Sequence, residues 1–281
     1  MATEIRADAD RSLAQGALSR LEQLGRRVAA MVSGLGFGAA LFIESAFWLV
    51  MGRRRRQPVR VAAVAEEMMQ VGVRAIPIVT VLSATIGVML AIQGIYTLGL
   101  FGAESRVTIG IALSITREFA PLITGILVAG RSGSALAARL GTMNISQEID
   151  ALRVMGINPV RFLVAPSLLA MLVMLPALTF WSDLIALAGA GVYVSFELGI
   201  SMAAYADQLI EVVSADDIVH GLSKSVIFAA LIALVGVVNG AAVSGGAEGV
   251  GRATTRAVVQ AITAIVITDM LFVFVTTRAA T

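Results

Sequence analysis

The chain has 281 residues, of which 58% are apolar and only 14% are charged, and its mean hydropathy is +0.88. Soluble domains carry about 25% charged residues, so this composition indicates a membrane protein rather than a soluble protein with one very large core. The formal net charge is only +2, cysteine is absent, and His220 and Lys224 are the single histidine and the single lysine. Disulfides, thiolate nucleophiles, cysteine metal sites and sites with two imidazoles are therefore excluded, and no metal site is expected.

The chain begins with residues 1–30, which we expect to form an N-terminal cytoplasmic extension. The apolar stretch Met31–Met51 follows and is long enough to span a bilayer, but arginines flank it on both sides, including the run Arg53–Arg56. If this stretch crossed the membrane, one arginine cluster would face outward, against the positive-inside bias. A helix lying in the cytoplasmic interface, with Phe47 and Trp48 at headgroup depth, avoids this conflict and is preferred, with a spanning helix as the alternative.

Five later stretches are apolar and long enough to cross about 30 Å of hydrocarbon as helices. They cover approximately residues 75–100, 107–133, 162–196, 225–245 and 257–277. We divide the chain after its extension into an interfacial helix with a basic linker, residues 31–74, and a membrane domain, residues 75–277. The sequence therefore predicts an all-α membrane protein with one amphipathic interfacial helix and five transmembrane helices.

The distribution of charge predicts the orientation of these spans. With a cytoplasmic N-terminus, 17 of the 21 basic residues lie on the cytoplasmic side and Arg117 lies in the membrane. Arg106 and Arg278 lie outside, and Lys224, near the outer boundary, is a further candidate for the outer side. The segment between the third and fourth spans is instead acidic and contains Glu197, Asp207, Glu211, Asp216 and Asp217. The positive-inside bias therefore predicts a multi-pass protein with its C-terminus outside.

A short amphipathic helix is predicted between the second and third spans, over about residues 146–156. Its expected capping residues are Asn144 or Ser146 at the start and Gly156 with Pro159 at the end. Its charged residues are Glu148 and Asp150 in the first turn and Arg153 near the end, and its apolar stripe is Ile149, Leu152 and Met155. This helix either packs on its own membrane domain or docks a cytoplasmic partner.

Three separated segments carry distinctive motifs, namely Arg117–Ala135, Glu148–Pro159 and Gly245–Val259. In this order they closely resemble the MlaE/YrbE family of ABC-transporter permeases, and the similarity covers roughly Val71 to Val275. One position departs from the family pattern. Relatives usually have an arginine after the proline that opens the third span, whereas Ser167 follows Pro166 here.

The resemblance implies an inner-membrane permease of a Gram-negative bacterium that works as a homodimer, with its C-terminus in the periplasm and residues 75–277 as the MlaE-type permease domain. Its implied partners are two ABC ATPase subunits, a periplasmic ring of MCE-domain proteins and, in some systems, a small STAS-domain protein, with no nucleic acid. The implied cargo is phospholipid or another hydrophobic molecule moved between the inner membrane and the periplasmic ring. The helix at 146–156 would be the coupling helix, and its expected ATPase-coupling residues are Glu148, Asp150, Leu152, Arg153, Met155 and Gly156.

No catalytic residues are expected, so the chain is predicted not to be an enzyme. A P-loop requires a glycine directly before its lysine, but the only lysine stands in the sequence Gly-Leu-Ser-Lys-Ser at 221–225. The esterase motif Gly-x-Ser-x-Gly fails at residues 130–134, where the last residue is serine. The glycine-rich run at 245–251 is expected to be a flexible turn. We expect this chain to bind no cofactor, and ATP with Mg would bind to the partner ATPase.

Four ionisable residues lie within the predicted spans, namely Arg117, Glu118, Asp183 and Asp269. Such residues are costly at bilayer depth unless they are paired or hydrated, so they tend to line cavities or protein contacts. One hypothesis is that Arg117 or Glu118 faces a lipid cavity near the dimer axis, where the arginine could hold a phosphate. The alternative is that the two residues bridge to another span, at Asp183 or Asp269.

Apolar cargo needs an apolar path, and Met89, Leu90 and Tyr96 near the outer end of the first span are candidates, because flexible methionines suit variable acyl chains. These residues can equally be ordinary packing. The alternatives to a phospholipid permease are a permease that imports sterols or other exogenous hydrophobic compounds, a secondary transporter that works alone, and a scaffold. A secondary transporter would predict paired broken helices or an internal repeat, and the five unequal spans display neither.

Overall fold

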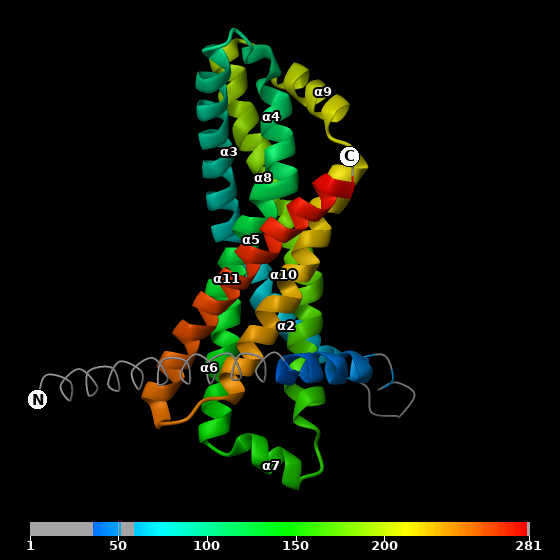
Figure 1. Ribbon diagram of the computed structural model, residues 1–281, viewed down its shortest axis with the longest axis vertical. Coiled ribbons are helices and arrows are strands. Elements are labelled where there is room, and N and C mark those ends of the chain that lie inside the picture. The colour runs from blue at the N-terminus through cyan, green and yellow to red at the C-terminus, as the bar shows by residue number, and fades with distance from the viewer. Residues whose placement is uncertain (1–35, 50, 52–58, 280–281) are drawn as a thin grey trace, which may run out of the picture.

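The computed structural model describes residues 36–49, 51 and 59–279, and this part of the chain is helical without any strand. The predicted extension 1–30, the start of the predicted interfacial helix and the arginine run at 53–56 lie outside the described residues. The remaining helices form an elongated bundle that the short apolar helix Gly36–Leu49 crosses near one end (Figure 1).

In chain order the α-helices after Gly36–Leu49 are α2 (Val61–Val71), α3 (Ile76–Gly99), α4 (Val107–Ser114), α5 (Ala120–Val128), α6 (Ser134–Ile145), α7 (Glu148–Val154), α8 (Ala165–Leu198), α9 (Met202–Val212), α10 (Ala215–Ala241) and α11 (Gly246–Ala279). Short 3-10 segments at Val73–Ala75 and Glu104–Arg106 and π-helical segments at Ile115–Phe119, Ala129–Gly133 and Val160–Val164 join several of them. Five continuous stretches are long and apolar enough to cross a membrane, namely Val61–Gly99, Glu104–Ile145, Val160–Leu198, Ala215–Ala241 and Gly246–Thr276. The predicted all-α architecture with five spans and a shorter apolar N-terminal helix is confirmed.

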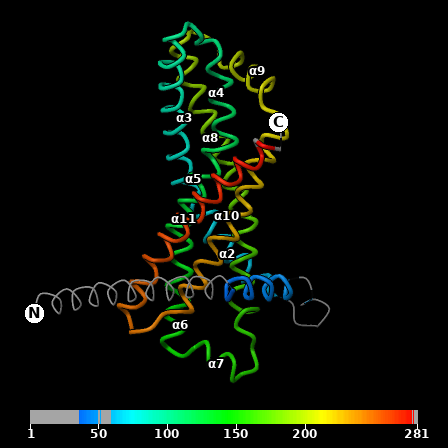
Figure 2. Tube along the Cα trace, in the orientation of Figure 1, coloured from blue at the N-terminus to red at the C-terminus, as the bar shows by residue number. Residues whose placement is uncertain are grey.

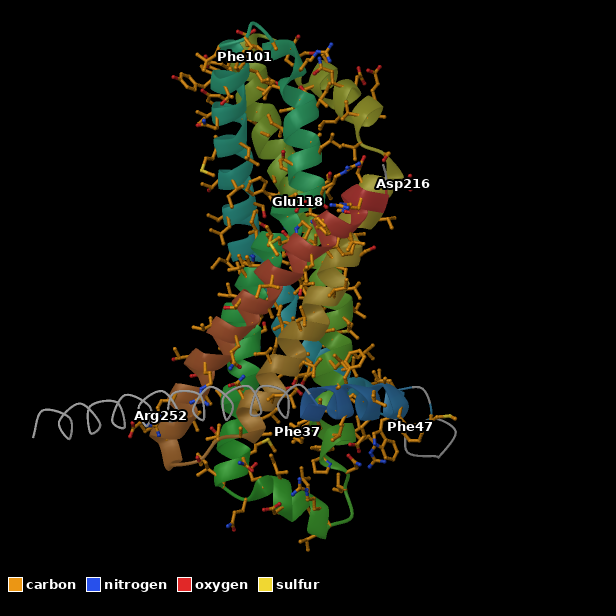
Figure 3. The ribbon with its side chains drawn as sticks, in the orientation of Figure 1. Phe37, Phe47, Phe101, Glu118, Asp216 and Arg252 are labelled. Carbon is orange, nitrogen blue, oxygen red and sulfur yellow. The ribbon has the colours of Figure 1, made fainter. Side chains whose placement is uncertain are left out.

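The helix Gly36–Leu49 lies across the lower end of the bundle, with Phe37 near one end and Phe47 near the other (Figure 3). It is tied to the bundle by Glu44, whose Oε1 accepts a hydrogen bond from Asn158 Nδ2 at 2.8 Å. This transverse position is the one expected of the interfacial alternative.

The predicted first span, 75–100, agrees with α3, and α2 precedes it through a 3-10 segment, so that the membrane-length stretch begins at Val61 and includes Glu67, which forms an ion pair with Arg139. Two other helices, α10 and α11, begin about ten residues earlier than their charge-free runs predicted. α10 begins at Ala215 rather than near residue 225, because Ser214 and Asp217 form a capping box at its N-terminus. The prediction ended each span at a charge, whereas the structure pairs or caps those charges within the helices.

The glycine-rich run at 245–251 is a tight turn followed by a helix. Gly245 and Gly246 have left-handed φ values of 87° and 71°, whereas Gly249 and Gly251 lie within α11. The prediction of a flexible turn over the whole run is therefore wrong beyond its first two residues. α11 then crosses the bundle diagonally, from α6 toward the start of α10 (Figure 2).

Small residues bring α3 and α8 into close contact along their length. A Cβ atom on Gly87 would lie 2.0 Å from the carbonyl oxygen of Ala186, so no larger residue fits there. In the same interface the hydroxyl oxygens of Ser83 and Ser182 are 2.7 Å apart. Close backbone approach with interhelical hydrogen bonds is typical of helices packed in a membrane.

Candidate functional site

Five charged side chains meet in the part of the bundle where Glu118 is labelled in Figure 3, between its middle and the end at which Phe101 lies. Arg117 and Glu118 come from the π-helical segment after α4, Asp217 and Lys224 from α10, and Asp269 from α11. Arg117 Nε donates to Asp217 Oδ1 at 2.6 Å. Lys224 Nζ lies 2.6 Å from Glu118 Oε2 and 3.0 Å from Asp269 Oδ1. We call these five residues the charged cluster.

The backbone at Arg117 explains part of the position of Lys224. Pro121 has no N–H, so the carbonyl of Arg117 lacks its usual helical donor four residues further on. Lys224 Nζ donates to this carbonyl oxygen at 3.0 Å. The single lysine therefore satisfies a backbone acceptor as well as two carboxylates, at a π-helical segment of the kind that often occurs at functional sites.

Gly221 allows α10 to approach this segment closely. A Cβ atom at position 221 would lie 2.1 Å from the carbonyl oxygen of Thr116. Asp217 and Lys224 are four residues before and three residues after this glycine, so they share its face of the helix. The close contact at Gly221 thus sets both charged side chains opposite Arg117 and Glu118.

Burial differs strongly within the charged cluster. The side chain of Lys224 is fully buried and that of Asp217 is 3% exposed, whereas the side chain of Glu118 is 34% and that of Arg117 is 50% exposed. The cluster holds three carboxylates and two cations, and such buried charges require partners because desolvation is costly. Arg117 is the member whose charge is most accessible from outside the chain.

These contacts correspond to the bridging alternative for Arg117 and Glu118, with partners that the sequence argument did not name. The bridges go to Asp217 and Lys224 of α10, and Asp269 is reached only through Lys224. Lys224, predicted near the outer boundary, is instead inside a membrane-length helix. A phosphate-binding role for the half-exposed Arg117 stays a prediction.

Asp183 is not part of the charged cluster. Its carboxyl is buried in α8, and its Oδ1 atom has no hydrogen-bond partner among the described residues. The predicted lipid-path residues Met89 and Tyr96 are 54% and 67% exposed on α3, while Leu90 packs toward the core. Their proposed role in a lipid path also stays a prediction.

The predicted coupling helix is α7, which lies between α6 and α8 at the end of the bundle opposite α9 (Figure 1). Leu152 is its buried residue, and Met155, with Val154, lies exposed at its end. Arg153 Nη1 and Asp150 Oδ1 form an exposed ion pair of 2.9 Å. The outward face of α7 therefore combines exposed charged groups with exposed apolar groups. Its charged groups form no ion pair with any described residue outside α7.

The caps of α7 differ from the prediction at one end. Gly156 has a left-handed φ of 73°, as expected. At the start, Gln147 occupies the N-cap position with a φ of 58° and no side-chain capping bond. Asn144 Nδ2 instead donates to the carbonyl oxygen of Val243 at 3.1 Å, and Ser146 Oγ donates to Glu148 Oε1 at 2.7 Å. Asn144 is thus used to join α6 to the end of α10.

The structure also accounts for Ser167, the departure from the family pattern. Arg139 Nη2 donates to Ser167 Oγ at 2.9 Å. A guanidinium group is therefore present beside this position, although it comes from α6 and not from α8. Neither Arg139 nor the buried pair Asp217 and Lys224 was predicted from the sequence to be part of a site. The spacing of the latter two on one helical face was the available signal.

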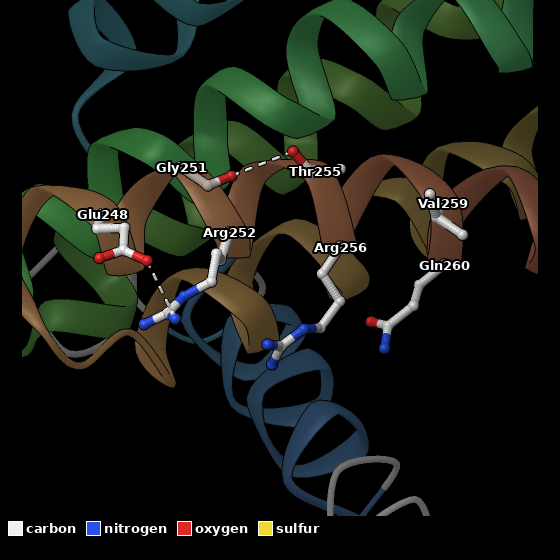
Figure 4. Close-up of a pocket in the computed structure, with 7 residues that line it drawn as sticks. All are labelled: Glu248, Gly251, Arg252, Thr255, Arg256, Val259 and Gln260. Carbon is white, nitrogen blue, oxygen red and sulfur yellow. Dashed lines mark hydrogen bonds and ion pairs between the residues drawn. The ribbon is translucent and has the colours of Figure 1, made fainter.

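A large open cavity of about 810 Å³ lies along the outer face of α11 (Figure 4). Glu248, Arg252, Arg256 and Gln260 follow one another at intervals of four residues and so share this face. Glu248 and Arg252 form an exposed ion pair of 3.3 Å. Only 17% of the most apolar stretch of α11 is buried within the chain, against 50% in three of the other spans.

Within the described residues, no group of three or more His, Asp or Glu side chains is placed to hold a metal ion.

Comparisons with known proteins agree with the motifs. The family model Permease MlaE matches residues 64–275. A probable ABC transporter permease protein of Rickettsia conorii is 32% identical over 216 residues, which are 77% of this chain and 83% of that protein. One from Synechocystis is 35% identical over 204 residues, 73% of this chain and 78% of that protein. The chloroplastic protein TRIGALACTOSYLDIACYLGLYCEROL 1 of Arabidopsis thaliana is 34% identical over 206 residues, 73% of this chain and 59% of that protein.

The family match extends from α2 almost to the end of α11 and contains all three motifs, so the resemblance found in the sequence is confirmed. Together with five membrane-length helices, it makes the chain a multi-pass membrane permease. The chain belongs to the MlaE permease family.

Proposed function

We propose that this chain is the non-catalytic permease subunit of an ABC transporter that moves phospholipids or similar hydrophobic molecules between a bacterial inner membrane and a periplasmic MCE-domain partner. A separate ATPase subunit binds ATP and Mg and powers the movement, while this chain binds no cofactor. The permease names of its relatives support an ATPase partner.

The observation that carries this proposal is the position of α7. This capped helix lies at one tip of the bundle, between two membrane-length helices. It exposes Glu148, Asp150, Arg153 and Met155, and charged side chains around an apolar group suit a protein contact. A helix held by the ends of α6 and α8 transmits a displacement of its partner directly to two spans.

The cargo is inferred from the membrane setting and from one relative. The name of the Arabidopsis relative refers to a diacylglycerol lipid, which supports a lipid cargo for this chain. The exposed face of α11 supports a homodimer, because a second copy packed there would cover the least buried of the five membrane-length helices. We further propose that α7 and the N-terminus are cytoplasmic, that the C-terminus is periplasmic, and that some complexes include a STAS-domain protein.

The ATPase contact is tested by replacing Glu148, Asp150 and Arg153 together with alanine in the full chain, co-expressed with its ATPase. These side chains are exposed, so the variant should fold, and the amount of ATPase that copurifies should fall strongly. A matched control replaces the exposed acidic residues Asp207 and Glu211 at the opposite end of the bundle. Normal ATPase recovery with the α7 variant would refute the coupling assignment.

The cargo is tested by mass spectrometry of lipids that copurify with the complex. Phospholipid is the expected result, and enrichment of a sterol or another exogenous hydrophobic compound would replace the cargo assignment without affecting the ATPase contact. Copurification without any ATP-dependent lipid movement in reconstituted vesicles would favour a scaffold.

A further inference from the structure

A small cavity of about 150 Å³ is lined by residues of α2, the 3-10 segment Val73–Ala75, the π-helical segment Ala129–Gly133, α6 and α8. Of these elements, α2 and α6 lie toward the α7 end of the bundle (Figure 1). The polar lining residues of the cavity are Glu67, Gln70, Arg74, Arg131, Ser132 and Arg139. We call it the arginine pocket. It shares no residue with the charged cluster or with the cavity along α11.

The three arginines of the pocket are only partly satisfied by the protein. Arg131 Nη1 donates to the carbonyl oxygen of Gln70 at 3.0 Å. Arg139 pairs with Glu67 and donates to Ser167, yet its Nε atom is buried and has no hydrogen-bond partner among the described residues. Arg74 is exposed at the edge of the pocket and forms no hydrogen bond or ion pair with any described residue. Donors therefore remain available from at least two of the three guanidinium groups.

The charge balance of the pocket favours an anion. Three guanidinium groups face one carboxylate, that of Glu67, so two positive charges lack a partner within the lining. Among their free donors, Arg139 Nε is buried, and a buried donor without an acceptor destabilises the chain, whereas Arg74 is exposed at the mouth of the pocket. An anionic ligand with several oxygens would supply acceptors to both. Guanidinium groups match the oxygens of phosphate in pairs of parallel hydrogen bonds, which makes phosphate the best-fitting anion.

The size of the cavity limits what enters it. A volume of 150 Å³ corresponds to about five water molecules at roughly 30 Å³ each. It suffices for a phosphate group with a few waters but is below the roughly 300 Å³ of a site for a whole drug-sized ligand. The rest of any larger ligand must therefore lie outside the pocket, as the acyl chains of a lipid would.

We propose that the arginine pocket binds the phosphate group of an anionic ligand, supplied by a phospholipid headgroup or by a soluble phosphate. This inference rests on the proposed function in one respect, since a headgroup site would give a phospholipid cargo a binding position on the α7 side of the bundle. Its test measures binding to the purified chain alone, so it does not depend on transport or on the ATPase.

The test compares the wild-type chain with Arg74→Gln in an uncharged detergent, using native mass spectrometry. The probes are dioleoyl phosphatidic acid, dioleoylglycerol, which has the same chains without the phosphate, and inorganic phosphate. Arg106→Gln is the matched control, because Arg106 is exposed near the opposite end of α3 and forms no ion pair or hydrogen bond through its side chain with the described residues. The wild type and the control should bind phosphatidic acid in preference to dioleoylglycerol, and Arg74→Gln should weaken this binding about tenfold.

The phosphate arm identifies the source of the ligand. If millimolar inorganic phosphate does not displace bound phosphatidic acid, the pocket is assigned to a lipid headgroup. If inorganic phosphate displaces phosphatidic acid, or if inorganic phosphate alone binds, the pocket is assigned to a soluble phosphate. Equal binding of phosphatidic acid to the wild type and to Arg74→Gln, or equal binding of the two lipids to the wild type, overturns the proposal.

A second variant guards against a folding defect. Arg131→Lys keeps the positive charge but cannot form the paired hydrogen bonds of a guanidinium group, so phosphate binding should fall severalfold while the melting temperature without ligand stays unchanged. Unchanged phosphate binding in this variant also contradicts the proposal. ATPase copurification should be normal in both pocket variants, which separates failure of the pocket from failure of the proposed coupling at α7.

Discussion

Replacing Lys224 with methionine removes the cation that joins two helical segments to α10. Methionine has a similar length and keeps the apolar stem packed, so the change isolates the ammonium group. Glu118 and Asp269 then lose their ion pairs of 2.6 and 3.0 Å, and the carbonyl of Arg117 loses its donor. Three acceptors are left without their common partner.

The magnitude follows from the burial of these groups. Breaking a buried ion pair by removing one partner costs about 3–5 kcal/mol. The side chain of Asp269 is 12% exposed, but that of Glu118 is 34% exposed and is relieved by solvent, so we expect a value near the lower limit, about 3 kcal/mol. At about 2–4 °C per kcal/mol for a chain of this size, the melting temperature should fall by about 6–12 °C.

The assay is thermal unfolding of the full chain in detergent, followed by helical circular dichroism. The decisive companion is the triple variant Lys224→Met, Glu118→Gln, Asp269→Asn, which removes the uncompensated charges and should regain most of the lost stability. A shift of less than about 2 °C for the single variant, or no recovery in the triple variant, would refute the reasoning. A triple variant that is stable but inactive in lipid transport would assign the charges of the cluster to function.

Two further substitutions test the packing around the site. Gly221→Ala places a methyl group 2.1 Å from the carbonyl oxygen of Thr116, so the yield of folded chain should fall sharply. The control Gly110→Ala, whose methyl group meets nothing within 4 Å, should leave the yield unchanged. Equal yields of the two variants would contradict the close contact at Gly221. Tyr205 is the buried residue of α9, and its hydroxyl donates a hydrogen bond to the carbonyl oxygen of Leu187 at 3.2 Å. Burial raises the pKa of this hydroxyl to about 12, so the hydroxyl stays a neutral donor at neutral pH. Tyr205→Phe should therefore lower stability by about 1 kcal/mol and expose α9 to limited proteolysis, and an unchanged cleavage rate would show that this bond does not hold α9.

The candidate site was only half predictable from the sequence. Arg117, Glu118 and Asp269 stood out because a charge within an apolar run is conspicuous. Asp217 and Lys224 did not, because they precede the charge-free part of α10 and resembled the end of an acidic loop. Their pairing depends on Gly221, which lets two backbones meet, and that contact has no local signature in the sequence.

Composition and hydropathy by themselves determined the class of this protein and the existence of its five spans, and the capping residues with an apolar stripe indicated the short helix between the second and third of them. The family was recognised from a different signal, the resemblance of three sequence motifs that occur in order along the chain. Only the tertiary structure decided where the helices begin, which charges are paired, and that Arg139 stands beside Ser167. The physical reason is that hydrophobicity and helical period are properties of neighbouring residues, whereas a buried charge is stabilised by a partner that lies far away in the sequence. That the exposed Arg74 has no such partner in the described part of the chain can likewise be recognised only when the whole surrounding pocket is known.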